Sequence, residues 1–115
     1  MSAETFAQLA ESVSVIIHAG ATVSAVLPYS FQRRANVIGT VNILRFACQT
    51  RLKAVHHVST MSVFANIEKM GGDIIDEKTE PHIKHMAMRT AYGQSKWIAE
   101  KLIRAAAAQG MAQFV

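Results

Sequence analysis

The chain has 115 residues, half of them hydrophobic, and a formal net charge of +4. This length provides one modest hydrophobic core and leaves no room for a second domain. The apolar stretches at 13–21 and 23–27 are too short for the roughly 20 residues of a membrane-spanning helix, and no basic segment of a secretory signal precedes them. The basic residues are scattered, which argues against nucleic-acid binding. We therefore expect a cytoplasmic protein that binds neither membranes nor nucleic acid.

The first half of the chain has the pattern of a strand, a helix and a second strand. After a short helix over 4–12, the run 13–18 is β-branched and almost wholly apolar, which predicts a strand buried on both faces, as in a parallel sheet. A longer helix is predicted over 31–50 and a second strand over 54–58. Two parallel strands joined by a helix form a right-handed crossover unit.

The helix predicted over 31–50 follows a loop that contains Gly20 and Pro28, and Ser30 is placed to cap it. Its apolar residues follow three-to-four spacing, which predicts one buried face. The residues of this face are Phe31, Ala35, Ile38, Val41, Leu44 and Cys48. Cys48, the only cysteine, is therefore expected to be a small buried hydrophobic side chain, and it cannot form an internal disulfide.

The second half of the chain begins with a region without clear periodicity. Residues 61–89 are predicted to form a long loop or lid. The final helix is predicted over 90–109, with Gly110 as its left-handed cap and Trp97 as a core anchor. Residues 111–115 resemble the start of a third strand. The predicted fold class is α/β, with three parallel strands and flanking helices.

Three predicted segments meet at one edge of such a sheet. Ligands of open parallel sheets bind where the carboxyl ends of the strands meet the amino ends of the following helices. The segments are 18–21 after the first strand, 59–60 after the second, and the start of the final helix at Tyr92. Lys96 follows Tyr92 by four residues, so both side chains are expected on one face of that helix.

These residue types suit the reduction of a carbonyl group. A phenol has a pKa of about 10, so its phenolate must be stabilised before it exchanges a proton at neutral pH. The Lys96 ammonium and the helix amino terminus would stabilise it, while the Thr60 hydroxyl would hold the substrate oxygen beside Tyr92. An alternative for the same spacing is a surface Lys96 that pairs with Glu100, four residues further on.

Five segments of the sequence, in this order, resemble the extended short-chain dehydrogenase/reductases. They are His18-Ala19-Gly20-Ala21, Pro28-Tyr29-Ser30, Asn36-Val37-Ile38-Gly39-Thr40, Val58-Ser59-Thr60-Met61-Ser62-Val63 and Tyr92-Gly93-Gln94-Ser95-Lys96-Trp97-Ile98-Ala99-Glu100-Lys101. Within that superfamily the chain is most similar to the thioester reductase domains of nonribosomal peptide and polyketide synthases, and to carboxylic acid, aminoadipate and fatty acyl-CoA reductases. The similarity covers roughly residues 5–115.

The resemblance implies that Thr60, Tyr92 and Lys96 form a catalytic trio. It also implies a nicotinamide cofactor, NADPH rather than NADH, whose ribose Lys96 would hold. Asn36 would support the site from the neighbouring helix; without the resemblance, Asn36 is equally well explained as a polar residue on a solvated helix face.

Further cofactor contacts are implied for the two strand ends. Gly20 and Ala21 would let the cofactor approach the backbone closely, because neither side chain is large. Ser59 and Tyr92 are the remaining residues expected to contact the cofactor.

The implied activity is the NADPH-dependent reduction of an acyl thioester to an aldehyde or alcohol. The thioester would be carried by a phosphopantetheine carrier protein or by CoA, within a larger synthase or reductase. One departure is that the sequence lacks the Gly-rich loop that cradles the cofactor pyrophosphate in the family. Residues 1–115 are therefore expected to form the C-terminal half of a Rossmann domain, with exposed apolar surface, and to be inactive and bind NADPH weakly when isolated.

Two other functions remain open. The chain is alternatively a non-catalytic truncated remnant that acts as an interaction module, or part of a sugar-nucleotide epimerase or dehydratase. A metal site is not expected. His56 and His57 must point to opposite faces of a strand, and His82 and His85 lie in a loop without a firm ligand spacing.

Overall fold

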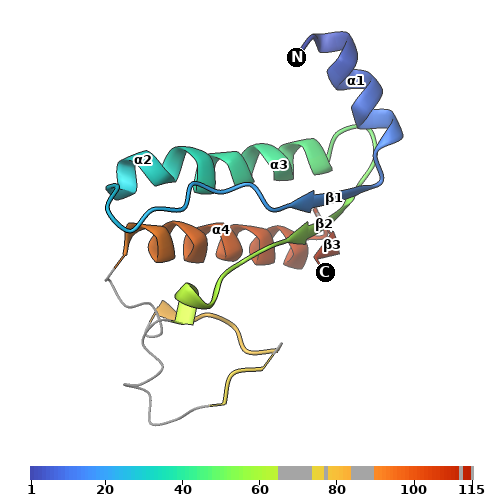
Figure 1. The fold of residues 1–115 in the computed structure, drawn as a ribbon. Helices are drawn as coiled ribbons and strands as arrows, with labels where there is room; N and C mark the ends of the chain where they lie inside the picture. Colours follow the sequence, from blue (N-terminus) through green and yellow to red (C-terminus); the bar gives the residue numbers. More distant parts are fainter. Residues whose placement is uncertain (65–73, 77, 84–89, 112, 115) are drawn as a thin grey trace.

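A computed structural model describes residues 1–64, 74–76, 78–83, 90–111 and 113–114. Its three strands are β1 (Val15–His18), β2 (Ala54–His57) and β3 (Gln113–Phe114), which lie side by side in the order β1-β2-β3 (Figure 1). Both pairs of neighbours are parallel. The prediction of three parallel strands is confirmed.

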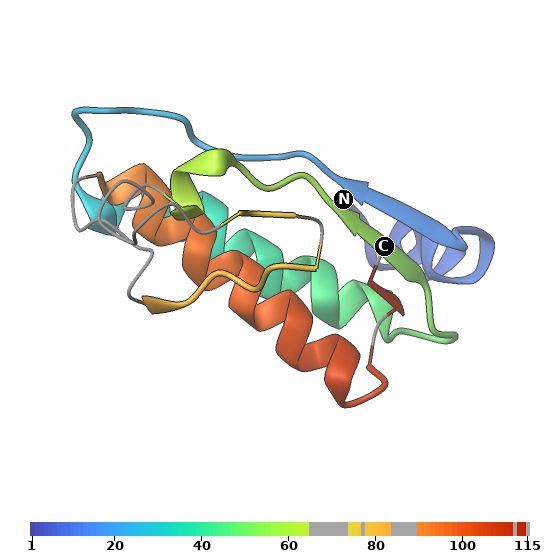
Figure 2. The same ribbon diagram turned by 90° about the horizontal axis from the view of Figure 1, so that it is seen from below.

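The helices α3 (Gly39–Ala47) and α4 (Ala91–Ala108) pack against one face of the sheet (Figure 2). The centre of the core is formed by Ala47 and Val55, which are fully buried. Three partly buried side chains pack against this pair: Ile16, Ile43 and Leu44. Because side chains alternate along a strand, this contact places every second strand residue toward the helices.

The strand β1 is buried on one face only, so the prediction of burial on both faces is wrong. Val15 is 50% exposed and Ile17 is 74% exposed, whereas His18 is buried. The reason is that the two covering helices lie on the same side of the sheet, and the described residues leave the other side open (Figure 2). The expected exposed apolar surface is thereby confirmed.

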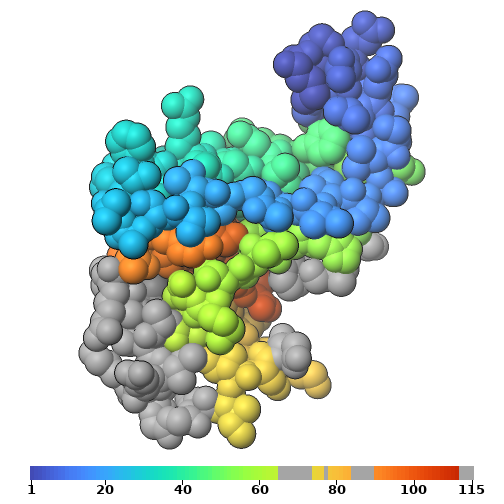
Figure 3. All heavy atoms as spheres, in the orientation of Figure 1, coloured from blue at the N-terminus to red at the C-terminus, as the bar shows by residue number. Residues whose placement is uncertain are grey.

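The first helix, α1 (Ala3–Ser12), projects from the end of the body at which the strands begin (Figure 3). Ser2 caps it by accepting a hydrogen bond from the backbone N–H of Thr5. The ring of Phe6 meets the ring of Phe46 edge-on, with 5.3 Å between the ring centroids. This aromatic contact joins α1 to α3.

The helix predicted over 31–50 has three parts and starts earlier. They are α2 (Tyr29–Arg33), a π-helical turn η1 (Arg34–Ile38) and α3. Pro28, not Ser30, is the residue before the first turn, and no side chain caps this end. The expected cap at Ser30 is wrong because proline already fixes the extended backbone from which the helix begins, and Ser30 lies inside it.

The buried face predicted for this helix is correct only in its middle, where Ile38, Val41 and Leu44 are half-buried and Leu44 packs against the core. Phe31 is 69% exposed, and Ala35 and Cys48 are exposed too. The fully buried polar residues are instead spaced by four: Gln32, Asn36 and Thr40. A π-helical turn holds more residues than an α-helical turn, so residues four apart stay on one face. Gln32 and Asn36 bond to the chain after β1, and Thr40 bonds to His18 at the end of β1, which favours that face.

Cys48 is exposed rather than buried. It follows the last residue of α3, and its Sγ donates a hydrogen bond of 2.8 Å to the carbonyl oxygen of Met111. The expectation of a buried hydrophobic cysteine fails because α3 ends one residue before it, which turns this side chain out of the core.

The helix α4 matches its prediction closely. Thr90 caps it by accepting a hydrogen bond from the N–H of Gly93, and Gly110 beyond its end has the positive φ of 69° expected of a left-handed cap. Trp97 is half-buried, with the Lys101 ammonium 5.9 Å from its ring centroid. Among the described residues, no helix has both the length and the hydrophobicity to span a membrane.

The region 61–89, predicted as a loop, begins with a short 3-10 helix, η2 (Met61–Phe64), which buries Val63 and Phe64. Further along, the structure describes residues 74–76 and 78–83, and Glu80 among them pairs with Lys101 of α4. His85, one of the two loop histidines considered for a metal, lies outside the described residues.

Candidate functional site

The carboxyl ends of β1 and β2 place two histidines side by side. His18 and His57 are register partners on the parallel strands, so both side chains project from the same face of the sheet. Their ring centroids are 5.2 Å apart. This face is the one covered by the helices, and the two imidazoles therefore lie between the strand ends and α3 and α4.

Lys96 reaches this same point from α4. Its side chain is buried, with 2% of the residue exposed. The ammonium donates one hydrogen bond of 2.8 Å to the carbonyl oxygen of Val58 and another of 3.2 Å to Nε2 of His57. The alternative of a surface Lys96 paired with Glu100 is therefore wrong. Burial lowers the pKa of Lys96, and the charge of Glu100 partly opposes that shift.

The two histidines hold complementary tautomers. An ammonium has no acceptor, so Nε2 of His57 must accept from Lys96. The hydroxyl of Thr40 donates its only hydrogen to the carbonyl oxygen of Asn36, so Nε2 of His18 must donate to Thr40, at 3.0 Å. Burial, and then the charge of Lys96, lower the pKa of His18, and the same causes lower that of His57 to about 4. Both rings are thus neutral at pH 7.

Asn36 fixes the chain that leaves β1. Its side chain accepts a hydrogen bond from the N–H of Thr22 at 2.7 Å and donates to the carbonyl oxygen of Thr22 at 3.0 Å. It also donates to the hydroxyl of Ser95, the neighbour of Lys96, at 2.8 Å. Asn36 is 1% exposed, so the alternative of a polar residue on a solvated face is wrong. One side chain links the loop after β1, the π-helical turn and α4.

Six residues around the strand ends are thus connected, and we call them the strand-end cluster. Its members are His18, Asn36, Thr40, His57, Ser95 and Lys96. Sequence reasoning found Asn36 and Lys96 but missed the others. The signal that could have found the histidines is the occurrence of a histidine as the last residue of two neighbouring parallel strands.

The first turn of α4 lies against the turn that carries Thr60. A Cβ added at Gly93 would lie 3.1 Å from the carbonyl oxygen of Ser62, which is closer than side chains normally pack. Glycine therefore allows the segment 60–62 to approach the backbone beside Tyr92. The hydroxyl of Thr60 donates to that of Ser62 at 3.3 Å, and Thr60 is half-buried.

Tyr92 is half-buried on the first turn of α4, one turn before Lys96. Its phenol makes no hydrogen bond within the described part of the chain. Gly20 and Ala21 are exposed on the loop after β1. A Cβ at Gly20 would meet only the ring of His18, at 3.8 Å, so packing within the chain does not require glycine there.

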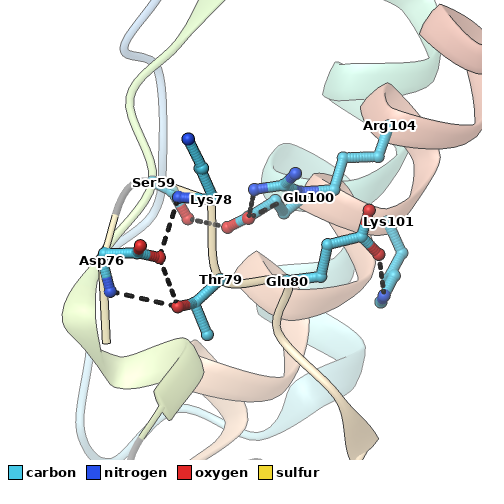
Figure 4. A network of polar contacts seen from close by, with 8 residues as sticks. All are labelled: Ser59, Asp76, Lys78, Thr79, Glu80, Glu100, Lys101 and Arg104. Carbon is cyan, nitrogen blue, oxygen red and sulfur yellow. Dashed lines mark hydrogen bonds and ion pairs between the residues drawn. The ribbon is translucent and has the colours of Figure 1, made fainter. Parts of the chain in front are cut away.

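Ser59 makes its hydrogen bond outside the strand-end cluster, although it lines a cavity together with His57 of that cluster. Its hydroxyl donates a 2.7 Å hydrogen bond to Glu100, whose other carboxylate oxygen accepts from Arg104 at 3.0 Å (Figure 4). Thr60 and Ser59, with Glu100 and Arg104, line a cavity of about 540 Å³ between η2, the segment 74–79 and α4. The expected cofactor contact of Ser59 stays a prediction.

The same side of α4 carries an exposed group of charges from the segment 76–80. Asp76 accepts hydrogen bonds from the Thr79 hydroxyl and the Lys78 backbone, and Glu80 forms a 3.5 Å ion pair with Lys101 (Figure 4). We call all eight residues of Figure 4 the loop network: Ser59, Asp76, Lys78, Thr79, Glu80, Glu100, Lys101 and Arg104. The described residues contain no group of three or more side chains that could hold a metal ion.

Several known proteins are similar to this chain in sequence, and solved structures are similar to it in fold. Aldehyde reductase lnbA from Aspergillus flavus is 41% identical over 102 residues, which are 86% of this chain and 10% of that protein. The large subunit of L-2-aminoadipate reductase from Candida glabrata is 35% identical over 117 residues, 94% of this chain and 8% of the relative. The terminal R domain of the myxalamid PKS-NRPS pathway is 37% identical, with a TM-score of 0.74 over 96% of this chain and 28% of that one.

The chain thus spans about a tenth of the length of the curated relatives that it matches. The structural match confirms the Rossmann-like α/β fold, and the relatives confirm the resemblance to terminal reductase domains. An NAD-binding family model, described as male sterility protein, matches residues 1–115. Because the match covers its whole length, the chain belongs to this NAD-binding family, the male sterility protein family.

Proposed function

We propose that the chain contributes the catalytic groups of an NADPH-dependent reductase that releases an acyl thioester as an aldehyde or alcohol. The observation that supports this proposal most strongly is the buried Lys96 ammonium, held at the carboxyl end of β2 one helical turn after Tyr92. Burial disfavours the charged form of Lys96 and lowers its pKa. Groups whose pKa is shifted in this way are concentrated at functional sites.

In this reaction, Tyr92 and Thr60 each have one task, and Lys96 has two. Tyr92 donates the proton to the substrate oxygen, and its position on the first turn of α4 places it in the positive field of the helix amino terminus. The Lys96 ammonium stabilises the phenolate that remains. Thr60 holds the substrate oxygen by a hydrogen bond beside Tyr92, since η2 lies against the first turn of α4.

Lys96 has a hydrogen-bond donor left for the nicotinamide ribose of the cofactor. A lysine ammonium has three hydrogens, and two of those of Lys96 are donated to Val58 and His57. The third is available for a ribose hydroxyl. When bound, NADPH would supply the hydride for the carbonyl carbon, and cleavage of the carbon–sulfur bond would then release the aldehyde and the carrier thiol. The pyrophosphate would need a Gly-rich loop that these 115 residues do not contain.

The proposed substrate is a thioester on a phosphopantetheine carrier protein or on CoA. The support comes from the matched proteins, which include an aldehyde reductase, an aminoadipate reductase and the terminal R domain of a PKS-NRPS pathway. Such domains act beside other domains of a larger chain, which agrees with the short share of each relative that is matched.

Replacement of Tyr92 by Phe in the complete native polypeptide tests the proposal. Loss of the proton donor is expected to lower kcat by about 100-fold or more, while the dissociation constant for NADPH stays within about twofold. Turnover with an acyl thioester and cofactor fluorescence titration measure the two quantities. Tyr29→Phe, the same change at the other tyrosine, is the matched control and should retain activity. Full activity of Tyr92→Phe would exclude the proposed role.

A further inference from the structure

The amine of Lys96 has two protein acceptors of different kinds. The first is the carbonyl oxygen of Val58, which belongs to the backbone at the end of β2. The second is Nε2 of His57, a side chain that the family motif segments listed above do not include. The lysine side chain has a flexible stem of four methylene groups, so a single hydrogen-bond acceptor fixes the position of its amine poorly. A second acceptor in another direction restricts that position further.

His57 has no other polar task in the described part of the chain. Its Nδ1 is buried and has no hydrogen-bond partner, and its remaining neighbour is the ring of His18. A buried N–H without an acceptor costs free energy, of the order of 1–3 kcal/mol. A leucine or phenylalanine at position 57 would have no unpaired N–H and would avoid this loss of stability. The hydrogen bond from Lys96 is the contact of the imidazole that can offset the loss.

The imidazole is also kept in the form that can accept. Burial and the charge of Lys96 hold the pKa of His57 at about 4, and the same two causes lower the pKa of His18. His57 contacts His18 on β1 and Lys96 on α4, and it also lines the cavity that Asp76, Glu100 and Arg104 line. Lys96 is therefore the only cation of the strand-end cluster at neutral pH.

We propose that His57 is a positioning residue, whose Nε2 aims the Lys96 ammonium so that its third hydrogen meets the nicotinamide ribose and its charge lies near Tyr92. This inference rests on the proposed function of Lys96. It assigns to His57 no contact with the substrate or the cofactor.

Two substitutions at position 57, made in the complete native polypeptide, separate the acceptor from the ring. His57→Phe keeps a ring against His18 and deletes the acceptor, whereas His57→Gln keeps an acceptor at about the reach of Nε2. His57→Phe is expected to weaken NADPH binding in a fluorescence titration, and to lower kcat/KM, by about tenfold or more, the value of one hydrogen bond to a charged group. His57→Gln is expected to stay within about threefold of the wild type.

Two further variants make the test specific. His56→Phe is the matched control, since it introduces the same side chain on the opposite face of β2 and should leave both quantities unchanged. In a Lys96→Met background, His57→Phe should have no additional effect on NADPH affinity, because the group that it positions is gone. Melting temperatures of all variants show whether each one is folded.

The outcomes distinguish this inference from the proposed function. If Lys96→Met retains both NADPH affinity and turnover, the proposed function itself is wrong. If Lys96→Met loses both while His57→Phe behaves as the wild type, only the positioning role is overturned. An equal loss in His57→Gln and His57→Phe, or an undiminished effect of His57→Phe in the Lys96→Met background, also overturns it.

Discussion

Two polar networks contact α4, and they are built in opposite ways. The strand-end cluster is buried: Asn36, Thr40, Ser95 and Lys96 are each exposed by 2% or less. It contains one cation and otherwise neutral groups. The loop network is more open to solvent and its members are mostly charged: Asp76, Lys78 and Glu80 are exposed, and most of the others are half-buried (Figure 4).

This difference shows where the chain depends on exact geometry. A buried polar group that loses its partner keeps its desolvation cost, whereas an exposed ion pair exchanges its partner for water. We therefore expect substitutions in the strand-end cluster to have large effects on stability and substitutions in most of the loop network to have small ones. Glu100 is the exception, because it belongs to the loop network but is 5% exposed.

The largest effect is expected for Asn36→Leu. This change removes three hydrogen bonds and leaves the N–H and carbonyl of Thr22 and the hydroxyl of Ser95 without their partner. The free energy of unfolding should fall by about 3 kcal/mol. Hydrogen exchange at the Thr22 amide should accelerate specifically. Asn42→Leu, on an exposed position of α3, is the control and should change neither quantity.

An intermediate effect is expected for Glu100→Gln. The neutral amide retains the size of the carboxylate but weakens the bonds from Ser59 and Arg104, so the free energy of unfolding should fall by about 1–2 kcal/mol. Glu80→Gln, the same change at the exposed pair, should cost under about 0.5 kcal/mol. Denaturant unfolding of both variants compares them. An equal loss of unfolding free energy in both variants would show that burial does not decide how much a carboxylate contributes to stability.

A graded effect is expected from mild acid, absent near neutral pH and growing as the pH falls. The pKa of His57 is about 4 in the folded chain and 6.5 when the histidine is unperturbed, so the unfolded state takes up its proton first. Stability should be constant above about pH 6.5 on account of this group and should fall as the pH falls toward 4; the lowered pKa of His18 acts with the same sign. The slope of melting temperature against pH should be smaller in His57→Phe. An unchanged slope would contradict this assignment.

The sequence allowed a correct prediction of the elements whose signals are local. The β-branched run of β1 and the glycine at 110 mark their elements without reference to distant residues. The expected approach of the segment after β2 to the start of α4 agrees with the close approach of Ser62 to Gly93. Lys96 lies at the strand ends, and its role remains a prediction.

Other features depend on tertiary packing and on strand register, which cannot be predicted from local sequence patterns. The π-helical turn at 34–38 moved the buried face from Phe31 to Gln32, and no propensity distinguishes such a turn from a regular helix. His57 was considered only as a metal ligand, because its pairing with Lys96 depends on the register of β1 against β2 and on the rotation of α4. Burial on both faces of β1 was expected from composition, which cannot show what covers a sheet.

The position of α4 between the two networks has a mechanical consequence. Lys96 donates to the strand ends, Glu100 accepts from Ser59 just beyond β2, and Lys101, the next residue of α4, pairs with Glu80. Because an α-helix is a rigid element, a displacement at one of these contacts is carried to the others. A displacement of Glu80 strong enough to move Lys101 would therefore also shift the ammonium of Lys96, which couples the surface to the strand ends.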